Sequence, residues 1–322
     1  MKKKSIFLLV FIMLVFGTTL YAQRVSDFQV TITDDFEGVI ITKYTGTVRA
    51  VTIPAAFEGI PLREIGEGAF SEKNITSVII PNGVITIGNG AFSWCRSLTS
   101  VTIPASVTTI GDNAFTLCTS LTSITIPAGV TTIGDYAFNG CRSLTSVTIP
   151  AGVTTIGDGA FSACDALRTI NLPASIEHIG ASAFSRSGLT SINWPAKVTV
   201  INRHVFQGCR GLTSITIPEG VTAINTEAFK ECSALTTVVL PSTIGVIQAG
   251  AFESCAALTT ITIPDSVTSI RFETNTPVTT TSFGITSVQN VLTNPFANCP
   301  RLNLASQQAL RRRGWDPNAG EE

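Results

Sequence analysis

CRSLTSVTIPASVTTIGDNAF, residues 95–115, decides the fold of this 322-residue chain, because the chain repeats the same pattern along most of its length. Aligned on its proline, the pattern recurs at Pro54, Pro81, Pro104, Pro127, Pro150, Pro173, Pro195, Pro218, Pro241 and Pro264. The spacing is 27 residues once, 23 four times, 22 once and 23 three times. A period of this length is typical of a solenoid, in which each copy is too small to bury its own apolar face and stacks on its neighbours.

Each repeat contains two extended segments. In the first, Leu98, Val101 and Ile103 are the residues expected to point inward, and the segment ends at Pro104 because proline cannot donate to a strand ladder. Residues 107–110 form the second segment. Two short strands per repeat, stacked in register along the array, predict parallel sheets.

A turn is predicted where the second segment ends. Most copies have glycine there, for example Gly111, and later copies have Asn202 and Asn225; both residue types tolerate positive φ. The aspartate that follows, for example Asp112, predicts the cap of a short helical turn, and the phenylalanines equivalent to Phe115 are expected to stack as a spine. The predicted fold class is therefore an α/β repeat solenoid.

One copy, LTSITIPAGVTTIGDYAFNGC at residues 121–141, closely resembles the unit LxxIxIPxxVxxIGxxAFxxC of the BspA-like, or treponemal-type, leucine-rich repeat family. The resemblance covers about residues 48–302. It implies a leucine-rich-repeat horseshoe with a parallel β-sheet on its concave face. It also implies a secreted or surface location in bacteria or microbial parasites, with roles in adhesion to host matrix proteins or to other cells.

The N-terminus has the pattern of a signal peptide. Lys2, Lys3 and Lys4 precede an apolar run of eleven residues, 6–16, which is too short for the roughly 20 residues that span a bilayer. Cleavage after Ala22 predicts an exported protein that is secreted, at the cell surface or periplasmic. No later stretch reaches spanning length, so we expect no membrane insertion after signal removal.

The rest of the chain divides into four predicted regions. These are an N-terminal β cap at 23–53, leucine-rich repeats of about 23 residues at 54–270, a Thr-rich insertion at 271–294, and a degenerate last repeat with a C-terminal cap at 295–322. The first is expected to hold a hairpin of residues 28–33 and 39–44, and the last a short helix over 306–313.

Composition excludes several function classes. The chain is 44% hydrophobic and only 13% charged, with a net charge of −1, so it carries no basic footprint for nucleic acid. Two histidines and the absence of a nucleophile-elbow motif predict a non-catalytic protein without a cofactor.

Seven of the eight cysteines share one repeat position: Cys95, Cys118, Cys141, Cys164, Cys209, Cys232 and Cys255. Stacked strands lie about 4.8 Å apart, which is wide for the Cβ atoms of a disulfide. We therefore expect buried free thiols that act as small hydrophobic residues. A metal site is not expected, because one position in successive repeats gives a line and not a tetrahedron.

Candidate binding residues lie where the repeat changes. Outward strand positions are mostly Ser and Thr, but between 165 and 210 other polar residues replace them: Arg168, Asn171, Glu177, His178, Asn193, Lys197, Arg203 and His204. These changes indicate either a ligand site or sequence drift in a tolerant array. Trp94 and Leu117 occupy the same variable position in adjacent repeats, which indicates either a protein-contact patch or ordinary scatter.

Together these observations predict an exported leucine-rich-repeat binding protein that mediates adhesion or recognition of an extracellular protein or glycan at the cell surface. The alternative is a structural or assembly scaffold within the cell envelope. Neither hypothesis fixes the oligomeric state.

Overall fold

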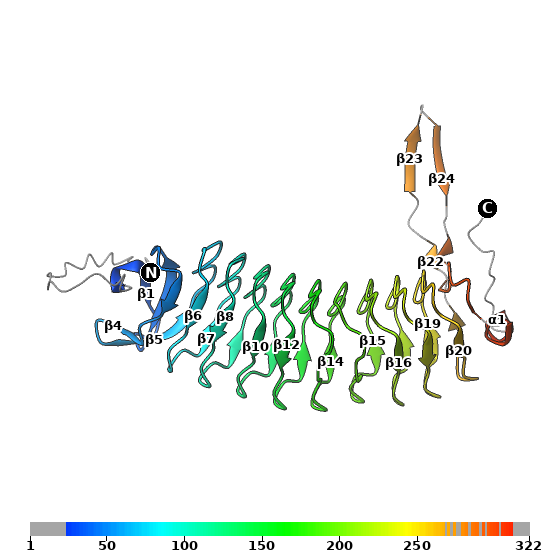
Figure 1. Cartoon of the computed structure of the whole chain (residues 1–322), viewed down its shortest axis with the longest axis horizontal. Helices are drawn as coiled ribbons and strands as arrows, with labels where there is room; N and C mark the ends of the chain where they lie inside the picture. Colours follow the sequence, from blue (N-terminus) through cyan, green and yellow to red (C-terminus); the bar gives the residue numbers. More distant parts are fainter. Residues whose placement is uncertain are drawn as a thin grey trace.

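The computed structural model describes residues 24–267, 295–302 and 304–311, together with the backbone of short strands between 269 and 293. The predicted signal peptide and much of the Thr-rich insertion lie outside the described residues. Figure 1 shows the repeats side by side along one long axis, each forming one rung of a β-solenoid. The horseshoe bend, the concave face and the two caps stay predictions.

Each regular rung contributes one strand to each of two parallel sheets. The first sheet precedes the prolines and contains β3 (Ala50–Thr52), β6 (Ser77–Ile79), β8 (Ser100–Thr102), β10 (Ser123–Thr125), β12 (Ser146–Thr148), β16 (Ser214–Thr216), β18 (Thr237–Val239) and β20 (Thr260–Thr262). Strand pairing divides it into three parts: β3, β6 and β8; β10 and β12; and β16, β18 and β20. The second sheet contains β5 (Ile60–Ile65), β7 (Thr86–Ile87), β9 (Thr109–Ile110), β11 (Thr132–Ile133), β13 (Thr155–Ile156), β14 (His178–Ile179), β15 (Val200–Ile201), β17 (Ala223–Ile224), β19 (Val246–Ile247) and β21 (Ser269–Ile270).

The remaining elements lie at the two ends. The N-terminal end has η1 (Val25–Asp27), the antiparallel hairpin of β1 (Phe28–Ile32) and β2 (Val39–Tyr44), and β4 (Ala56–Phe57). The C-terminal end has β22 (Glu273–Thr274), β23 (Val278–Ser282), β24 (Ile285–Gln289), β25 (Leu292–Thr293) and helix α1 (Leu304–Arg311). In Figure 1 the β23–β24 hairpin projects from the array near its C-terminal end.

The alternation of apolar and polar residues along each strand explains which side chains of the first sheet are buried. In β10 the central Ile124 is buried and Ser123 and Thr125 are exposed, and Ser123 pairs in register with Ser146 of the next rung. Each rung therefore turns one β-branched side chain into the core and two hydroxyls toward solvent, as the repeat predicted.

A phenylalanine spine runs the length of the core, as expected. From Phe70 to Phe252 and on to Phe296, successive rings stack face to face at centroid separations between 4.9 and 6.0 Å. All of these rings are buried. Stacked, buried aromatic rings are a major source of stability in so thin a core.

The cysteine row forms the predicted buried free thiols. Seven thiols are buried, and Cys299 is half-buried. Each donates a hydrogen bond to the phenylalanine carbonyl of the rung before, for example Cys118 Sγ to Phe92 O at 3.1 Å. The thiols thus also satisfy buried carbonyls, a role that the sequence pattern did not indicate.

The predicted helical turns do not form in the described repeats, which have hydrogen-bonded turns in their place. The chain is therefore a β-solenoid with almost no helix, and the α/β assignment is corrected. The aspartates act between rungs and not as local caps: Asp112 Oδ1 accepts the backbone N–H of Asp135 at 2.8 Å. Because this bond joins rungs, it strengthens the stack itself.

The glycine row has a different cause from the one expected. None of its members has positive φ; at Gly134, an added Cβ would come within 2.8 Å of Asp112 Oδ1 and of the Gly111 backbone. Close approach of adjacent rungs, and not backbone conformation, therefore requires glycine here. Positive φ occurs further along the turn, for example at Asn113 (57°) and Leu117 (58°).

Both sheets are interrupted in the middle of the array. The first sheet has no strand between β12 and β16, and β14 does not pair with β15 in the second. The spine is widest at the same place, with Phe184 lying 6.0 Å from Phe161 and 5.9 Å from Phe206. The interruption coincides with the single 22-residue repeat.

The turns that follow the second-sheet strands, called the turn side below, keep their hydrogen bonds across the interruption. Ser182 N donates to Arg203 O at 3.0 Å and Phe184 N to Val205 O at 3.0 Å. Trp194, which replaces a strand isoleucine here, is buried against Phe206 with ring centroids 5.6 Å apart. The two rungs therefore lose their strand pairing in the second sheet but keep backbone bonds in the turns, and Thr190 N still donates to Arg168 O at 2.9 Å before the first-sheet position.

Candidate functional site

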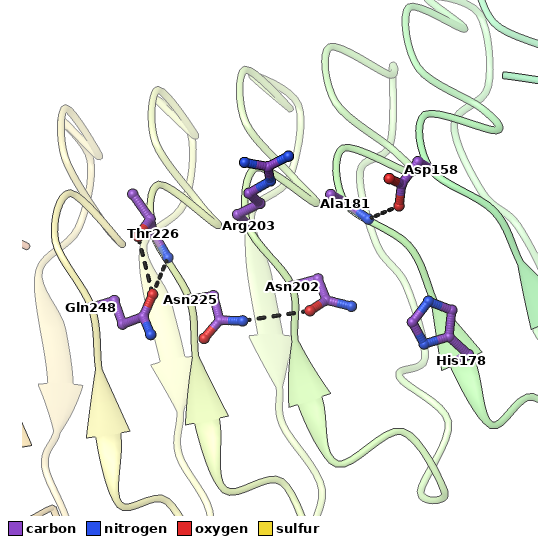
Figure 2. Close-up of a pocket in the computed structure, with 8 residues that line it drawn as sticks. All are labelled: Asp158, His178, Ala181, Asn202, Arg203, Asn225, Thr226 and Gln248. Atoms are coloured by element: carbon purple, nitrogen blue, oxygen red, sulfur yellow. Dashed lines mark hydrogen bonds between the residues drawn. The ribbon is translucent and has the colours of Figure 1, made fainter. Parts of the chain in front are cut away.

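A polar groove of about 460 Å³ lies over the interruption in the second sheet. It is lined by Asp158, His178 and Ala181 from one side and by Asn202, Arg203, Asn225, Thr226 and Gln248 from the other (Figure 2). The volume falls within the roughly 300–1,000 Å³ range of small-ligand sites. The groove is the principal candidate site among the described residues.

The groove begins where the column of inter-rung aspartates ends. Asp158 Oδ1 accepts the N–H of Ala181 at 2.6 Å, and alanine offers no carboxylate to the following rung. Asp135 Oδ1 lies next to Gly157, and Asp158 Oδ1 lies next to Gly180. The equivalent residue before Asn202 is Ala181, so no carboxylate takes up the space beside Asn202. A side chain fits at that corner for the first time in the array.

Amide side chains then take over the inter-rung contacts. Asn202 Nδ2 donates to Ile179 O at 2.7 Å, in the place where Gly180 and Asn225 use their backbone N–H. Asn225 Nδ2 reaches Asn202 Oδ1 at 3.4 Å, and Gln248 Oε1 accepts from Thr226 N at 3.1 Å. The floor of the groove is thus a row of amides parallel to the long axis (Figure 2).

Two groove side chains remain available for a ligand. In the described part of the chain, no hydrogen bond or ion pair engages the imidazole of His178 or the guanidinium of Arg203, and both residues are exposed. With the Asp158 carboxylate and the amide row, they offer both donors and acceptors to a polar ligand.

The structure brings only two of the residues predicted from the sequence, His178 and Arg203, into this groove. Arg168, Asn171 and Asn193 belong to the rungs that lack first-sheet strands, with Arg168 Nη1 donating to Gly188 O at 3.4 Å and Asn193 Nδ2 to Leu172 O at 3.4 Å. The predicted residues therefore do not form one cluster.

Three more predicted residues contact charged groups of neighbouring rungs. Glu177 pairs with Lys197 at 2.6 Å between their charged atoms, and both are exposed. His204 Nε2 lies 3.3 Å from Glu227 Oε2, on the turn side of the array. These contacts link neighbouring rungs, which is a sufficient structural role for all three residues.

Trp94 and Leu117 lie several rungs from the groove. The Trp94 ring is exposed and carries the Arg96 guanidinium at 4.8 Å from its centroid. Leu117 is half-buried, so it does not extend an exposed apolar patch around Trp94. A role for either residue in protein contact remains a prediction.

Sequence reasoning missed Asp158, Asn202, Asn225, Thr226 and Gln248 as groove residues. The available signal was the change from glycine to amide at the corner position, together with the loss of aspartate after residue 158. Only the inter-rung distances show that these two changes are linked.

The fold defines the class of protein: a solenoid of short, parallel-stranded repeats with a continuous aromatic spine. The model of the BspA type leucine rich repeat region matches residues 63–190 and 177–303. The chain belongs to this family.

Solved structures of several bacterial proteins match the chain. A leucine rich cell surface protein of Faecalibacterium prausnitzii is 28% identical over 75% of this chain and 94% of its own, with a TM-score of 0.37. A leucine-rich repeat protein of Eubacterium ventriosum is 25% identical over 76% and 91%, with a TM-score of 0.47. The pneumococcal vaccine antigen PcpA is 18% identical over 86% and 78%, with a TM-score of 0.56.

No curated protein matches the chain. Among the described residues, no helix has the length and apolar character needed to cross a bilayer. Within that same part of the chain, no three or more His, Cys, Asp or Glu side chains converge as a metal site would require.

Proposed function

We propose that this protein is an exported, non-catalytic recognition protein that binds an extracellular glycan through the groove at residues 158–248 and mediates adhesion at the cell surface. The observation that carries the proposal is the groove itself, which combines a carboxylate, an amide row and two unengaged basic side chains. The N-terminal signal-peptide pattern and membership of the BspA type repeat family support the location and the non-catalytic role.

Glycan chemistry suits this lining better than an apolar ligand. Sugar rings present adjacent hydroxyls that donate and accept at once, and planar amide, carboxylate and guanidinium groups pair with two such hydroxyls together. The groove runs along the stack of rungs, so an extended oligosaccharide can contact several of them. No large exposed apolar side chain is among its lining residues.

Binding to an array of host and microbial glycans, with calorimetry on any hit, tests the proposal. Replacing His178 and Arg203 together by alanine is expected to weaken binding by about tenfold or more, the loss typical when a buried or partly buried polar contact is removed. A matched variant, Arg168→Ala with Asn193→Ala, changes comparable residue types outside the groove and is expected to bind normally.

The results separate the hypotheses. If the Arg168/Asn193 variant loses binding and the His178/Arg203 variant does not, the groove is not the site. If no glycan binds and a matrix protein does, the ligand class is wrong. Protease treatment of intact cells, with sequencing of the mature N-terminus for a start at Gln23, tests surface exposure and export separately.

A structural scaffold in the cell envelope is a second candidate function. It is favoured by one specific observation: strand β1 ends a nine-stranded sheet, and no other described strand pairs with its outer edge. A protein confined to the periplasm would resist protease on intact cells, whereas a surface adhesin would not.

A further inference from the structure

The N-terminal end of the solenoid presents an open strand edge. In the part of the chain that the structure describes, β1 pairs with β2 on one side only, and β2 in turn joins the second sheet at β5. Thr33 N donates to Gly38 O, so by the alternation of antiparallel strands Thr31 also faces β2. The backbone groups of Val30 and Ile32 therefore point outward from the sheet.

Exposed apolar side chains gather around this edge. Val25, Val30, Ile32 and Phe36 are 45%, 41%, 44% and 78% exposed, respectively. They make up four of the nine large apolar residues exposed in the described part of the chain, although they span only twelve positions. Neither lysine nor proline, the usual protections of an edge, occurs in residues 28–33.

The last strand of the first sheet shows how an edge in this chain is covered. Helix α1 lies beside β20, and Ser306 Oγ donates to Ile261 O at 3.1 Å and accepts from Ile261 N at 3.2 Å. This one side chain satisfies both backbone groups of Ile261. No equivalent contact covers β1 among the described residues.

We propose that β1 pairs with β1 of a second copy of this chain, joining two solenoids end to end across a two-fold axis at Thr31. In this arrangement Val30 and Ile32 of one copy exchange backbone hydrogen bonds with Ile32 and Val30 of the other. Their four side chains then lie together on one face of a sheet that continues through both molecules.

The flanking residues fit the same symmetry. Antiparallel pairing brings η1 of one copy beside the 33–38 turn of the other, which places Val25 next to Phe36. It also brings Arg24 next to the acidic residues Asp34, Asp35 and Glu37, none of which has an ion pair in the described structure. Asp27 of the same element already accepts the Arg24 backbone N–H at 3.0 Å. In the proposed dimer, apolar side chains of one copy thus contact apolar side chains of the other, and Arg24 of each copy lies near acidic residues of the other.

Sedimentation velocity of the purified protein over a micromolar to millimolar range, with hydrogen exchange at each end of that range, tests this inference. We expect a concentration-dependent dimer, and protection of the Val30 and Ile32 amides that appears only in it. A monomer at every concentration, an open-ended polymer, or a dimer without this protection would overturn the proposal.

Variants then locate the interface. Val30→Lys with Ile32→Lys is expected to weaken the dimer by about a hundredfold, because like charges are brought to the centre of the pair. The matched control, Ile79→Lys with Val239→Lys, changes two equally exposed apolar residues on the first sheet and is expected to dimerise normally. If both double variants lost dimer affinity equally, β1 would not be the interface.

A charge exchange adds a test that does not depend on the apolar residues. Arg24→Glu is expected to weaken the dimer by about tenfold, and Arg24→Glu combined with Glu37→Arg to restore it. If Arg24→Glu combined with Glu37→Arg did not restore the dimer, the proposed contact between Arg24 and the 33–38 turn would be wrong. Glycan binding by the groove is expected to be the same in all of these variants, so the dimer and the groove are tested independently.

Discussion

The carboxylate of Asp135 accepts the backbone N–H of Asp158 at 2.7 Å, so a side chain in one rung satisfies a backbone donor in the next. The same relationship joins Asn89 to Asp112, Asp112 to Asp135 and Asp158 to Ala181. This ladder of side chains adds a further line of hydrogen bonds along the stack, beside the two sheets, the turn-side backbone bonds and the row of thiols.

Replacing Asp135 by alanine removes one step of this ladder. We expect a loss of about 1 kcal/mol in the free energy of unfolding, the usual value of one such hydrogen bond. Asp135→Asn keeps an acceptor oxygen and is expected to lose less than half as much. Urea unfolding followed by circular dichroism measures both, and equal losses would show that charge and not the hydrogen bond matters.

Gly157 is expected to tolerate no side chain. An added Cβ would collide with Asp135 Oδ1 and lie 2.7 Å from Asp135 N and 2.8 Å from Gly134 C. Gly157→Ala is therefore predicted to destabilise the protein by about 1–3 kcal/mol through forced separation of two rungs. Gly245→Ala is the control, since its nearest neighbour is Thr222 O at 3.8 Å, and we expect a change within about 0.5 kcal/mol. Similar unfolding midpoints for the two variants would refute the close-approach explanation.

Much of this fold could be predicted from the sequence, because a repeat reports the same structural position many times. The strand that includes Ile124, the phenylalanine spine and the buried thiols all follow from which positions stay apolar. The cause of the glycine row could not be predicted, because a glycine that avoids a neighbouring rung and a glycine with positive φ look alike in one sequence. Positive φ in fact falls on residues such as Trp94, Tyr136 and His204.

The candidate site was only partly predictable for a related reason. The departures at residues 165–210 include part of the groove lining, but repeat position alone does not say which side of the rung opens. His178 and Arg203 line the groove, whereas Arg168 and Asn193 do not. The opening coincides with the buried Trp194 and with the single 22-residue repeat, and the sequence alone does not give the distances between the rungs there.

Alkaline pH is expected to destabilise the protein through its buried thiols. Burial raises the pKa of Cys209 from 9.0 to about 11, although hydrogen bonding with Ser187 opposes the shift, and burial raises the pKa of Cys95 to about 12. The folded state therefore disfavours the thiolate. The stability contributed by the neutral Cys209 thiol is complete below pH 9 and is lost as the pH rises through 11.

Urea unfolding at several pH values checks this prediction. The free energy of unfolding should fall less steeply above pH 9 in Cys209→Ala than in the unsubstituted protein, because one thiol no longer titrates on unfolding. The variant itself should be less stable at neutral pH, since it loses the hydrogen bond to Phe184 O at 3.0 Å. If the free energy of unfolding fell equally steeply with pH in the two proteins, the pH dependence could not be assigned to Cys209.

The interruption between β14 and β15 also has a mechanical consequence. A solenoid under tension carries load through the bonds between consecutive rungs, and here the turn side retains its backbone bonds while the second sheet does not. Force applied to the two ends would therefore bear here on the turn-side bonds of Ser182 and Phe184 and on the side-chain bond from Asn202 Nδ2 to Ile179 O. A tethered molecule that bends at its midpoint in flow would thereby widen the groove at the same place.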